Sequence, residues 1–326
     1  MEHKKEAKKA LRGFAAFSVF TVPIKPSFLN RRKFYIKIRG LMINKKQQRV
    51  AAIHDLSGFG RCSLSVIIPV LSSMGIQCCP VPTAVLSTHT GGFEDIVIKD
   101  LTDYISPTLA QYKKVGISFD AVYSGFLASA EQIDHCLEFF SAYKDSLKVV
   151  DPVMGDSGKP YRTYTPELCR RMGELVDVAD VITPNLTEAA ILLGERYPME
   201  LTAGLVKKWL ARLCERVRVT VITGVPLAEG TIANVGFDRE LGGFWRVDCD
   251  YVPASYPGTG DIFASVLTGS LLSGDSLPIA IDRATMFTQI AIKNTFSYGL
   301  EPRNGVLFEP SLNRLHDDPP CGFKRL

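Results

Sequence analysis

The sequence lacks the long hydrophobic runs of a membrane-spanning protein. Its longest mainly apolar stretch near the N-terminus, residues 14–24, is far shorter than the roughly 20 residues that a spanning helix requires. It also lacks strong compositional bias, since 46% of the residues are hydrophobic and 22% are charged. A multi-span membrane protein, a disordered chain and a fibrous repeat are therefore excluded. With 326 residues, the chain can form one large globular domain or two ordinary ones.

Signatures of metal-binding and disulfide-linked proteins are missing too. None of the eight cysteines forms a CxxC pair, and none of the five histidines lies four residues from another. Zinc sites and disulfide frameworks usually show such spacings. We therefore expect reduced thiols and no zinc site.

Two common nucleotide-binding motifs are absent as well. The phosphate-binding sequence GxxxxGK[ST] does not occur, so any kinase encoded here must be of another design. Gly58-Phe59-Gly60 follows the first predicted strand, but the third glycine of a dinucleotide-binding motif is missing. A Rossmann dehydrogenase is therefore a weaker alternative.

Charge is unevenly distributed along the chain. Residues 1–50 hold 14 of the 38 Lys and Arg residues and 2 of the 34 acids, a net charge of +12. The remainder carries −8, which leaves the formal total of +4. Because the body is acidic and shows no basic patch interleaved with aromatic residues, nucleic-acid binding is not predicted.

The basic N-terminal extension, residues 1–44, has three possible interpretations. It could be an organellar transit peptide, a secretory signal, or an added tail upstream of a natural start at Met42. We expect a cytoplasmic protein, or an organellar one if the extension is a transit peptide.

From Arg49 onward, short apolar runs alternate with segments of helical periodicity. The apolar runs are residues 50–53, 78–85, 121–123, 149–150, 181–182 and 219–222. The helical segments are residues 64–74, 130–143, 166–176, 186–193 and 203–214. This alternation predicts a three-layer α/β/α sandwich with a mostly parallel central sheet that is buried on both faces.

The pattern changes near residue 230. Residues 230–252 contain two β-rich stretches around a polar, Gly-containing turn, which predicts a small antiparallel hairpin at the end of the sheet. Two long helices, residues 262–272 and 278–295, are predicted next. No repeat or low-complexity linker interrupts residues 45–310, so we expect one domain there. Residues 311–326 form a C-terminal tail whose Pro-rich end we expect to fray.

The most informative polar cluster is Pro257-Gly258-Thr259-Gly260-Asp261, directly before a predicted helix. Glycines there allow backbone N–H groups to face an anion at the positive end of the helix dipole. A carboxylate in the same place could deprotonate an attacking hydroxyl during phosphoryl transfer. The plainer alternative is that an acid is favoured in any first helical turn.

With this cluster, the chain resembles the ribokinase-like superfamily and, within it, the vitamin B6 (pyridoxal, pyridoxine and pyridoxamine) kinases. The resemblance covers about residues 49–300. The segments that carry it are HDLSGFGRCS (54–63), THTGG (88–92), YSGFLASAEQ (123–132), DPVMGD (151–156), ITPNLTEA (182–189), VITG (221–224) and GTGD (258–261).

The resemblance implies roles for the GTGD residues. Asp261 would be the general base that takes the proton of the substrate's primary alcohol. Gly258, Thr259 and Gly260 would form the anion hole. It also implies a homodimer, ATP as co-substrate and Mg²⁺, and it leaves open whether a monovalent cation assists.

Other residues are assigned to the nucleotide by the same resemblance. Asp151 and Asp156 would face the phosphates and Mg²⁺, partly through water, and Thr223 would lie at the nucleotide. Asn185 and Glu188 form the N-x-x-E element, in which Glu188 would help hold metal-bound water. Each has a plainer alternative, because DPVMGD could be an ordinary turn and ITPNLTEA an ordinary capped helix start.

The substrate end is predicted from HDLSG and THTGG. Asp55 should project from a strand end and could bind a ring hydroxyl or a pyridine nitrogen, where many B6 kinases carry serine. His89 and Thr90 lie in a segment similar to the element of B6 kinases in which threonine contacts the pyridine ring. A lone histidine is more often a hydrogen-bonded structural residue than a ligand. Phe126 could stack on a flat ring or pack in the core.

We therefore predict a kinase that phosphorylates the 5′-hydroxymethyl group of a B6 vitamer. The D-x-S-G-x-G sequence is also similar to the opening of hydroxymethylpyrimidine (phosphate) kinases, which is the nearest alternative. A ligand-binding relative without catalytic activity is the alternative from another class.

Overall fold

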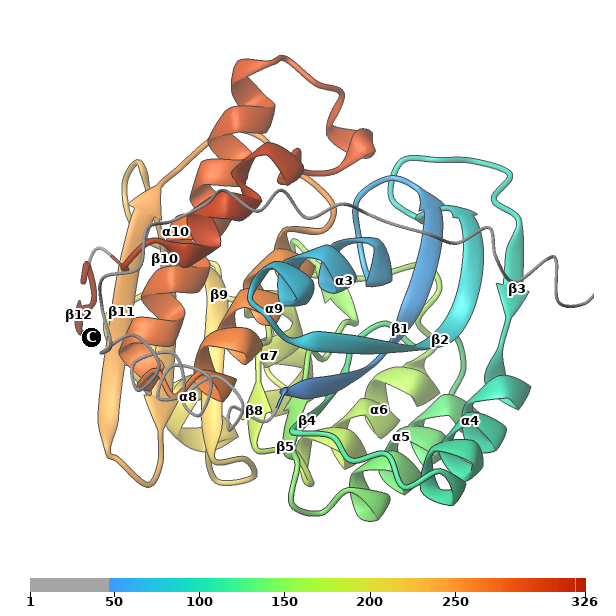
Figure 1. The fold of residues 1–326 in the computed structure, drawn as a ribbon. Coiled ribbons are helices and arrows are strands. Elements are labelled where there is room, and N and C mark those ends of the chain that lie inside the picture. The colour runs from blue at the N-terminus through green and yellow to red at the C-terminus, as the bar shows by residue number, and fades with distance from the viewer. Residues whose placement is uncertain (1–46, 320) are drawn as a thin grey trace, which may run out of the picture. The chain divides into compact units, whose positions relative to one another are not determined.

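The apolar runs of the sequence form one extended sheet at the centre of the molecule (Figure 1). The structure is a computed structural model that describes residues 47–319 and 321–326. These residues belong to one compact unit, Gln47–Leu326. The predicted basic extension lies outside the described residues.

In this described part of the chain, ten strands follow the order β12-β11-β10-β9-β8-β5-β4-β1-β2-β3 across the sheet. The six central strands, β9, β8, β5, β4, β1 and β2, are parallel. Strands β3, β10, β11 and β12 pair antiparallel at the two edges. The strands are β1 (Arg49–Phe59), β2 (Gln77–Thr88), β3 (Ile98–Asp100), β4 (Ala121–Ser124), β5 (Leu147–Val150), β8 (Val181–Ile182), β9 (Val219–Ala228), β10 (Thr231–Asp238), β11 (Gly243–Asp250) and β12 (Lys324–Arg325). A separate small hairpin consists of β6 (Gly155–Asp156) and β7 (Lys159–Pro160).

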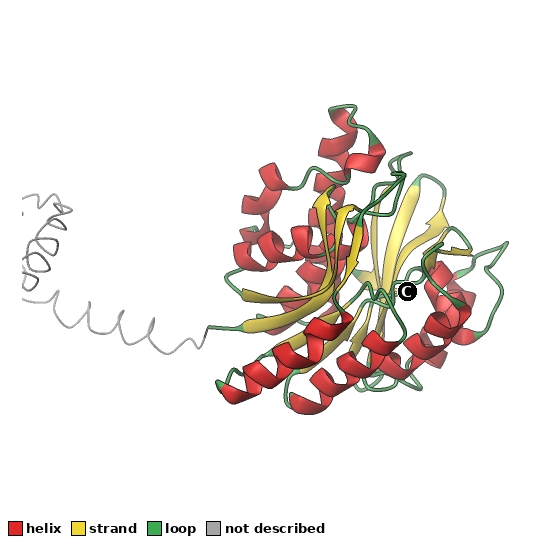
Figure 2. Ribbon diagram, turned by 90° about the vertical axis from the view of Figure 1, so that its right-hand side faces the viewer, coloured by secondary structure: helices red, strands yellow, loops and turns green. Residues whose placement is uncertain are grey.

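Helices cover both faces of the sheet (Figure 2). One face packs against α4 (Thr102–Lys114), α5 (Glu131–Ala142), α6 (Pro166–Val176), α7 (Leu186–Leu193) and α8 (Ala203–Leu213). The other packs against α3 (Leu64–Ser73), α9 (Thr259–Leu272), α10 (Leu277–Ser297) and the 3₁₀ helix η3 (Glu309–His316). A shorter 3₁₀ helix, η2 (Pro302–Asn304), precedes η3. The predicted three-layer sandwich is therefore confirmed.

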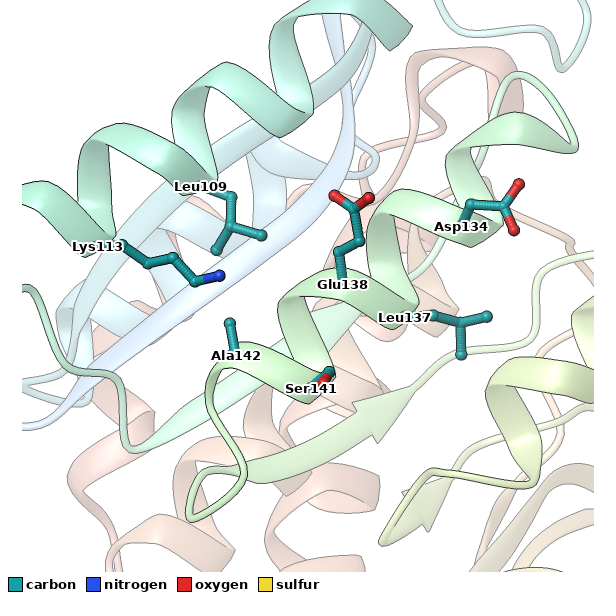
Figure 3. A pocket seen from close by; sticks show the side chains of 7 residues that line it. All are labelled: Leu109, Lys113, Asp134, Leu137, Glu138, Ser141 and Ala142. Carbon is teal, nitrogen blue, oxygen red and sulfur yellow. The ribbon is translucent and has the colours of Figure 1, made fainter.

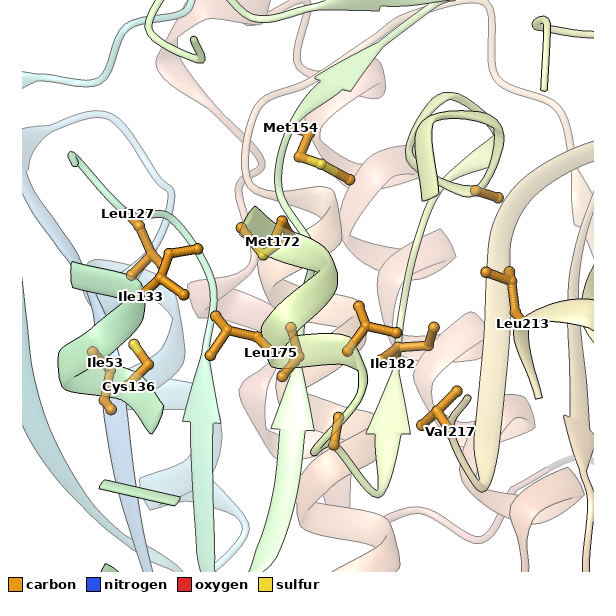
Figure 4. Close-up of a cluster of buried hydrophobic side chains, with 14 of the residues drawn as sticks. Ile53, Leu127, Ile133, Cys136, Met154, Met172, Leu175, Ile182, Leu213 and Val217 are labelled. Carbon is orange, nitrogen blue, oxygen red and sulfur yellow. The ribbon is translucent and has the colours of Figure 1, made fainter. Parts of the chain in front are cut away.

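The two cores follow from the alternation of side chains along each strand. In β1, Ala51 and Ile53 lie in the core beneath α4–α8, whereas Val50 and Ala52 lie in the core beneath α3, α9 and α10. Figure 4 shows the first core, in which Met172 and Leu175 of α6 lie over the strands. Since both faces are covered, the strands read as continuous apolar runs rather than alternating ones.

The antiparallel hairpin predicted for residues 230–252 is present as β10 and β11. It extends the sheet beyond β9, and Phe237 and Phe244, which face each other across it, stack at 4.0 Å between ring centroids. The polar residues between the two strands form the turn, as expected for a hairpin.

The end of the chain differs from the expectation of a frayed tail. Ser311 and Leu315 of η3 are buried, and Lys324 and Arg325 pair with β11 as strand β12. Trp245 of β11 explains the difference, because its ring packs edge-on against Phe323 and lies 3.9 Å beneath the Arg325 guanidinium. These contacts outweigh the local preference of a Pro-rich segment for disorder.

Candidate active site

The predicted site residues lie where the parallel strands end. Asp151 follows β5 and Asn185 follows β8. Asp261 lies in the first turn of α9, which packs on the face of the sheet that α3 and α10 also cover. Because side chains alternate along a strand, Asp151 points to the side of Val149, the side that α9 covers. The carboxylates of Asp151 and Asp261 are consequently close enough to repel each other.

Asp261 is oriented by a segment remote in sequence. Its Oδ2 accepts a hydrogen bond from the backbone N–H of Ser63 at 2.7 Å. The carboxylate is therefore engaged outside its own helix, so capping of α9 is not the whole explanation for an acid at this position. The first backbone N–H groups of α9 cannot find partners within the helix and remain available for an anion.

Gly258 is required by the backbone at the start of α9. Its φ of 86° is left-handed, and a Cβ atom would lie 1.9 Å from the carbonyl oxygen of Arg61. Gly260 faces the acids, since a Cβ atom there would lie 3.8 Å from Oδ2 of Asp151. The structure thus brings the GTGD residues together with Asp151, as the sequence predicts.

The electrostatics of the acids depend mainly on their burial. Burial, with smaller contributions from the charges of Asp151 and Asp55, raises the pKa of Asp261 to about 8, although the Ser63 N–H opposes the shift. Burial also raises the pKa of Asp151. The pKa of Glu188 is raised by burial and by the charge of Asp151. A group of acids held this way favours a bound cation.

Asn185 and Glu188 form a capping box at the start of α7. Asn185 Oδ1 accepts from the N–H groups of Thr187 and Glu188, at 2.8 and 3.0 Å. Glu188 Oε2 accepts from the Asn185 N–H at 2.9 Å, and its Oε1 accepts from the Met154 N–H at 3.0 Å. The plainer interpretation, a capped helix start, is therefore confirmed. The role of these residues toward nucleotide stays a prediction.

The same helix start holds the β6–β7 hairpin. Asn185 Nδ2 donates to the Gly155 carbonyl at 2.8 Å, and the Gly158 N–H donates to Thr187 Oγ1 at 2.8 Å. Asp156 lies on this hairpin with an exposed side chain. Thr223 lies beside Asn185, with which it forms an isolated β-bridge. Both predicted nucleotide residues thus lie on elements adjoining α7.

Asp55 occupies an irregular point of β1, where the pairing with β2 shifts register between His54 and Leu56. It is 4% exposed, and it accepts hydrogen bonds from the hydroxyls of Ser57, at 3.1 Å, and Ser63. Burial raises its pKa. A buried carboxylate with donor partners on the protein can also receive a donor from a ligand.

Cys62 lies between Asp55, at the predicted substrate end of the site, and Asp261. Its Sγ donates to Ser57 Oγ at 3.5 Å, and the thiol is buried. Burial and the negative charges of Asp55 and Asp261 raise its pKa well above the usual range.

The remaining substrate candidates differ in their surroundings. Both ring nitrogens of His89 are occupied by the backbone, because Nδ1 accepts from the Gly91 N–H at 3.0 Å and Nε2 lies 2.7 Å from the Arg303 carbonyl oxygen. Thr90 is exposed. Phe126 is partly buried against the core and contacts Tyr164 edge-on, with ring centroids 5.7 Å apart. The structure thus places Thr90, rather than His89, with a polar group at the surface.

Sequence reasoning missed a row of buried polar residues beneath α9. His54, Tyr123 and Thr183 continue the strand alternation on the face that Ser265 of α9 covers, and neither ring nitrogen of His54 has a hydrogen-bonding partner in the part of the chain the structure describes. The His54 and Tyr123 rings meet edge-on at 4.3 Å, and burial lowers the pKa of His54 to about 3. Extending the period of two beyond the apolar runs could have found them.

Sequence reasoning also missed Tyr161, directly after β7. Its side chain is 43% exposed, and the Tyr161 N–H donates to the Met154 carbonyl at 2.9 Å. Burial and the charges of Glu188, Asp156 and Asp151 raise its pKa, so its hydroxyl lies near the acids. No signal in the sequence distinguishes this tyrosine from any other loop residue.

The acids fit a hard cation that arrives with a phosphate ligand. Among residues 47–319 and 321–326, no three His, Cys, Asp or Glu side chains are grouped closely enough to hold a metal by themselves. Both oxygens of Glu188 already accept backbone N–H groups. Mg²⁺ keeps several water molecules and takes phosphate oxygens, so a sparse set of carboxylates is compatible with it.

A surface hollow of about 540 Å³ lies elsewhere, between α4 and α5 (Figure 3). It is lined by Leu109, Lys113, Asp134, Leu137, Glu138, Ser141 and Ala142. These residues extend to the C-terminal ends of their helices, toward the amino ends of the strands, so the hollow does not belong to the site.

No helix of the described residues is long and apolar enough to cross a membrane.

The fold and the grouped acids define the class: the protein is a kinase of the ribokinase-like superfamily. Residues 68–305 match the family model described as phosphomethylpyrimidine kinase, and the chain belongs to that family.

Similar proteins include B6 kinases. A Bacteroides thetaiotaomicron protein described as a phosphomethylpyrimidine kinase, solved with pyridoxal, is 44% identical; the match has a TM-score of 0.83 and covers 86% of this chain and 100% of that one. The pyridoxal kinase of Lactobacillus plantarum is 30% identical with a TM-score of 0.77, covering 83% and 97%. A pyridoxal kinase of Leifsonia xyli is 26% identical over 261 residues, covering 77% and 90%.

Proposed function

We propose that the protein transfers the terminal phosphate of ATP to the 5′-hydroxymethyl group of pyridoxal, pyridoxine or pyridoxamine. The observation that carries this proposal is the position of the Asp261 carboxylate, at the N-terminus of α9 and close to Asp151. There it can take a proton from an alcohol while the neighbouring backbone N–H groups stabilise charge on the transferring phosphate.

In this mechanism, Asp261 orients and deprotonates the alcohol for in-line attack. The N–H groups of Thr259 and Gly260 face the phosphate, and Gly258 allows the backbone to turn toward it. Mg²⁺ bound with the nucleotide would neutralise phosphate charge, held by Asp156 and, through water, by Glu188. Asp55 receives a donor group of the substrate ring.

The B6 substrates are supported by the pyridoxal in the structure of the 44% identical relative. Hydroxymethylpyrimidine or its phosphate is the second candidate, because the family model carries that description. Both substrates present a primary alcohol on a flat nitrogen heterocycle, so the same base can serve either.

The test is ADP release by the full chain with MgATP and a panel of pyridoxal, pyridoxine, pyridoxamine, hydroxymethylpyrimidine and its monophosphate. We expect the highest kcat/KM with a B6 vitamer. A preference for the pyrimidines would replace the substrate assignment. Tight binding of a vitamer without turnover would favour the ligand-binding alternative.

We also propose that the protein is a homodimer, as the resemblance to B6 kinases implies. We propose that it acts in the cytoplasm, or in an organelle if residues 1–44 are a transit peptide. Light scattering gives the oligomeric state, and mass measurement of the mature N-terminus shows whether residues 1–44 are removed. Assays in potassium, sodium and bulky organic cations determine whether a monovalent cation assists.

A further inference from the structure

The turn between β1 and α3 contains an unusual backbone conformation. Ser63, the last residue before α3, has φ 50° and ψ −135° and is 6% exposed. A residue with a Cβ atom rarely adopts positive φ, and such a conformation persists only where its surroundings impose it. The contacts of Ser63 therefore reveal what imposes it.

Ser63 is hydrogen-bonded to two site acids at once. Its backbone N–H donates to Asp261 Oδ2 at 2.7 Å, and its hydroxyl donates to Asp55 Oδ1. The two acids come from different elements, since Asp55 lies on β1 and Asp261 on α9. Ser63 thus connects Asp55, which is proposed to bind the substrate ring, with Asp261, the proposed base.

Neighbouring contacts hold this turn against α9. The Arg61 carbonyl oxygen occupies the space that a side chain at Gly258 would need, and Arg61 forms a β-bridge with Gly305. Ser57 donates to the second oxygen of Asp55 at 3.1 Å. The Ser63 N–H therefore has little freedom to turn away from Asp261.

We propose that Ser63 is a positioning residue for the base. Its hydroxyl is anchored on Asp55, and this anchor directs its backbone N–H to Oδ2 of Asp261, so that the other carboxylate oxygen faces the substrate alcohol. The proposal rests on the proposed function in taking Asp261 as the base.

This arrangement affects both geometry and ionisation. An N–H bond stabilises the charged form of a carboxylate and so opposes the effect of burial. A small displacement of a reacting group can also lower the rate strongly. Loss of the anchor should therefore misalign Asp261 and raise its pKa, while contacts to ATP stay intact.

The test compares Ser63→Ala with a matched control, Ser65→Ala. Ser65 lies in the first turn of α3, and within the described residues its hydroxyl bonds to the carbonyl oxygens of Cys62 and Gly60 and to the Cys62 N–H, but to no site acid. We expect Ser63→Ala to lower kcat about tenfold, to leave KM for MgATP within twofold and to move the acid limb of the pH profile upward. Ser65→Ala should show none of these changes.

Ser63→Gly is the second variant, because glycine adopts positive φ without strain and keeps the N–H. It should fold and reproduce the pH shift. If both Ser63 variants keep the wild-type kcat and acid limb, or if Ser65→Ala reproduces their effects, the assignment is wrong.

A second readout does not depend on turnover. Carboxyl carbon NMR titration of ¹³C-aspartate-labelled protein, with the Asp261 resonance assigned by its loss in Asp261→Asn, gives the pKa of that residue directly. We expect a higher pKa in Ser63→Ala than in wild type or Ser65→Ala. Equal pKa values would overturn the positioning role, whereas failure of the substrate panel alone would affect only the proposed function.

Discussion

At the scale of single residues, Asp261 has the ionisation that a general base requires. Burial and two neighbouring acids raise its pKa to about 8, so a proton taken from an alcohol is held more strongly than by an ordinary aspartate. The Ser63 N–H keeps the ionised form accessible near neutral pH.

Replacement of Asp261, the proposed base, should slow catalysis strongly without unfolding the protein. We expect Asp261→Asn to lower kcat at least ~10²-fold while ATP binding is retained, because only proton transfer is lost. Fixed-time assays of ADP release measure kcat, and calorimetric titration with ATP measures binding. The control is Asp103→Asn, which changes an exposed acid in the first turn of another helix, α4. Comparable activity of the two variants would contradict the role of Asp261.

The pKa of Asp261 also predicts the pH dependence of the rate. At low concentrations of both substrates, the rate reports the free enzyme, and the base must be deprotonated. The rate should therefore rise with pH, about tenfold per unit, until it levels near the pKa of about 8. A rate that is constant between pH 6 and 8, measured by ADP release, would contradict this assignment.

At the scale of elements, the start of α9 depends on the absence of a side chain at Gly258. The backbone there is left-handed and meets the Arg61 carbonyl. Gly274, just beyond the other end of α9, also has a positive φ, of 93°, but open space surrounds it. The two glycines separate backbone strain from a steric clash.

Alanine at these two positions should therefore have unequal effects. We expect Gly274→Ala to cost about 1 kcal/mol of unfolding free energy, from φ alone. Gly258→Ala should cost at least about 3 kcal/mol and remove activity, because the turn and the helix must move apart. Urea unfolding of both variants gives the comparison. Equal costs would show that the clash is relieved elsewhere.

The elements were predictable where their signals are local. The glycines before α9 and the turn between β10 and β11 define those structures in the sequence itself. Strand β12 could not be predicted, because the packing of Phe323 on Trp245 stabilises it and that contact is not local. The contact between Ser63 and Asp261 could not be predicted for the same reason, because the two residues are 198 positions apart. Each of them nevertheless belongs to a segment that carries the resemblance to B6 kinases.

At the scale of the whole molecule, the sheet brings several acids to one edge at a cost in stability. The pKa values of Asp55, Asp151, Glu188 and Asp261 are all raised. Above pH 4, the folded state therefore holds protons that the unfolded state has released. The free energy of unfolding should decrease as pH rises from about 4 through the raised pKa values.

Asp261→Asn should reverse part of this loss. Without Mg²⁺ or nucleotide, we expect the variant to be more stable than wild type by about 2 kcal/mol at pH 9 and equally stable at pH 4. The figure is below the full value of the shift because the side chain is partly exposed. Urea unfolding at both pH values provides the check. A variant less stable than wild type at pH 9 would contradict the linkage.

The environment of Cys62 has a consequence for chemical reactivity. The thiolate is the nucleophilic form of cysteine, and here burial and two adjacent carboxylates suppress it. Aldehydes, alkylating reagents and peroxide that enter the site should therefore leave this sulfur unmodified. An aldehyde-bearing vitamer that binds beside Asp55, as proposed, should therefore leave the site without a covalent adduct to this cysteine.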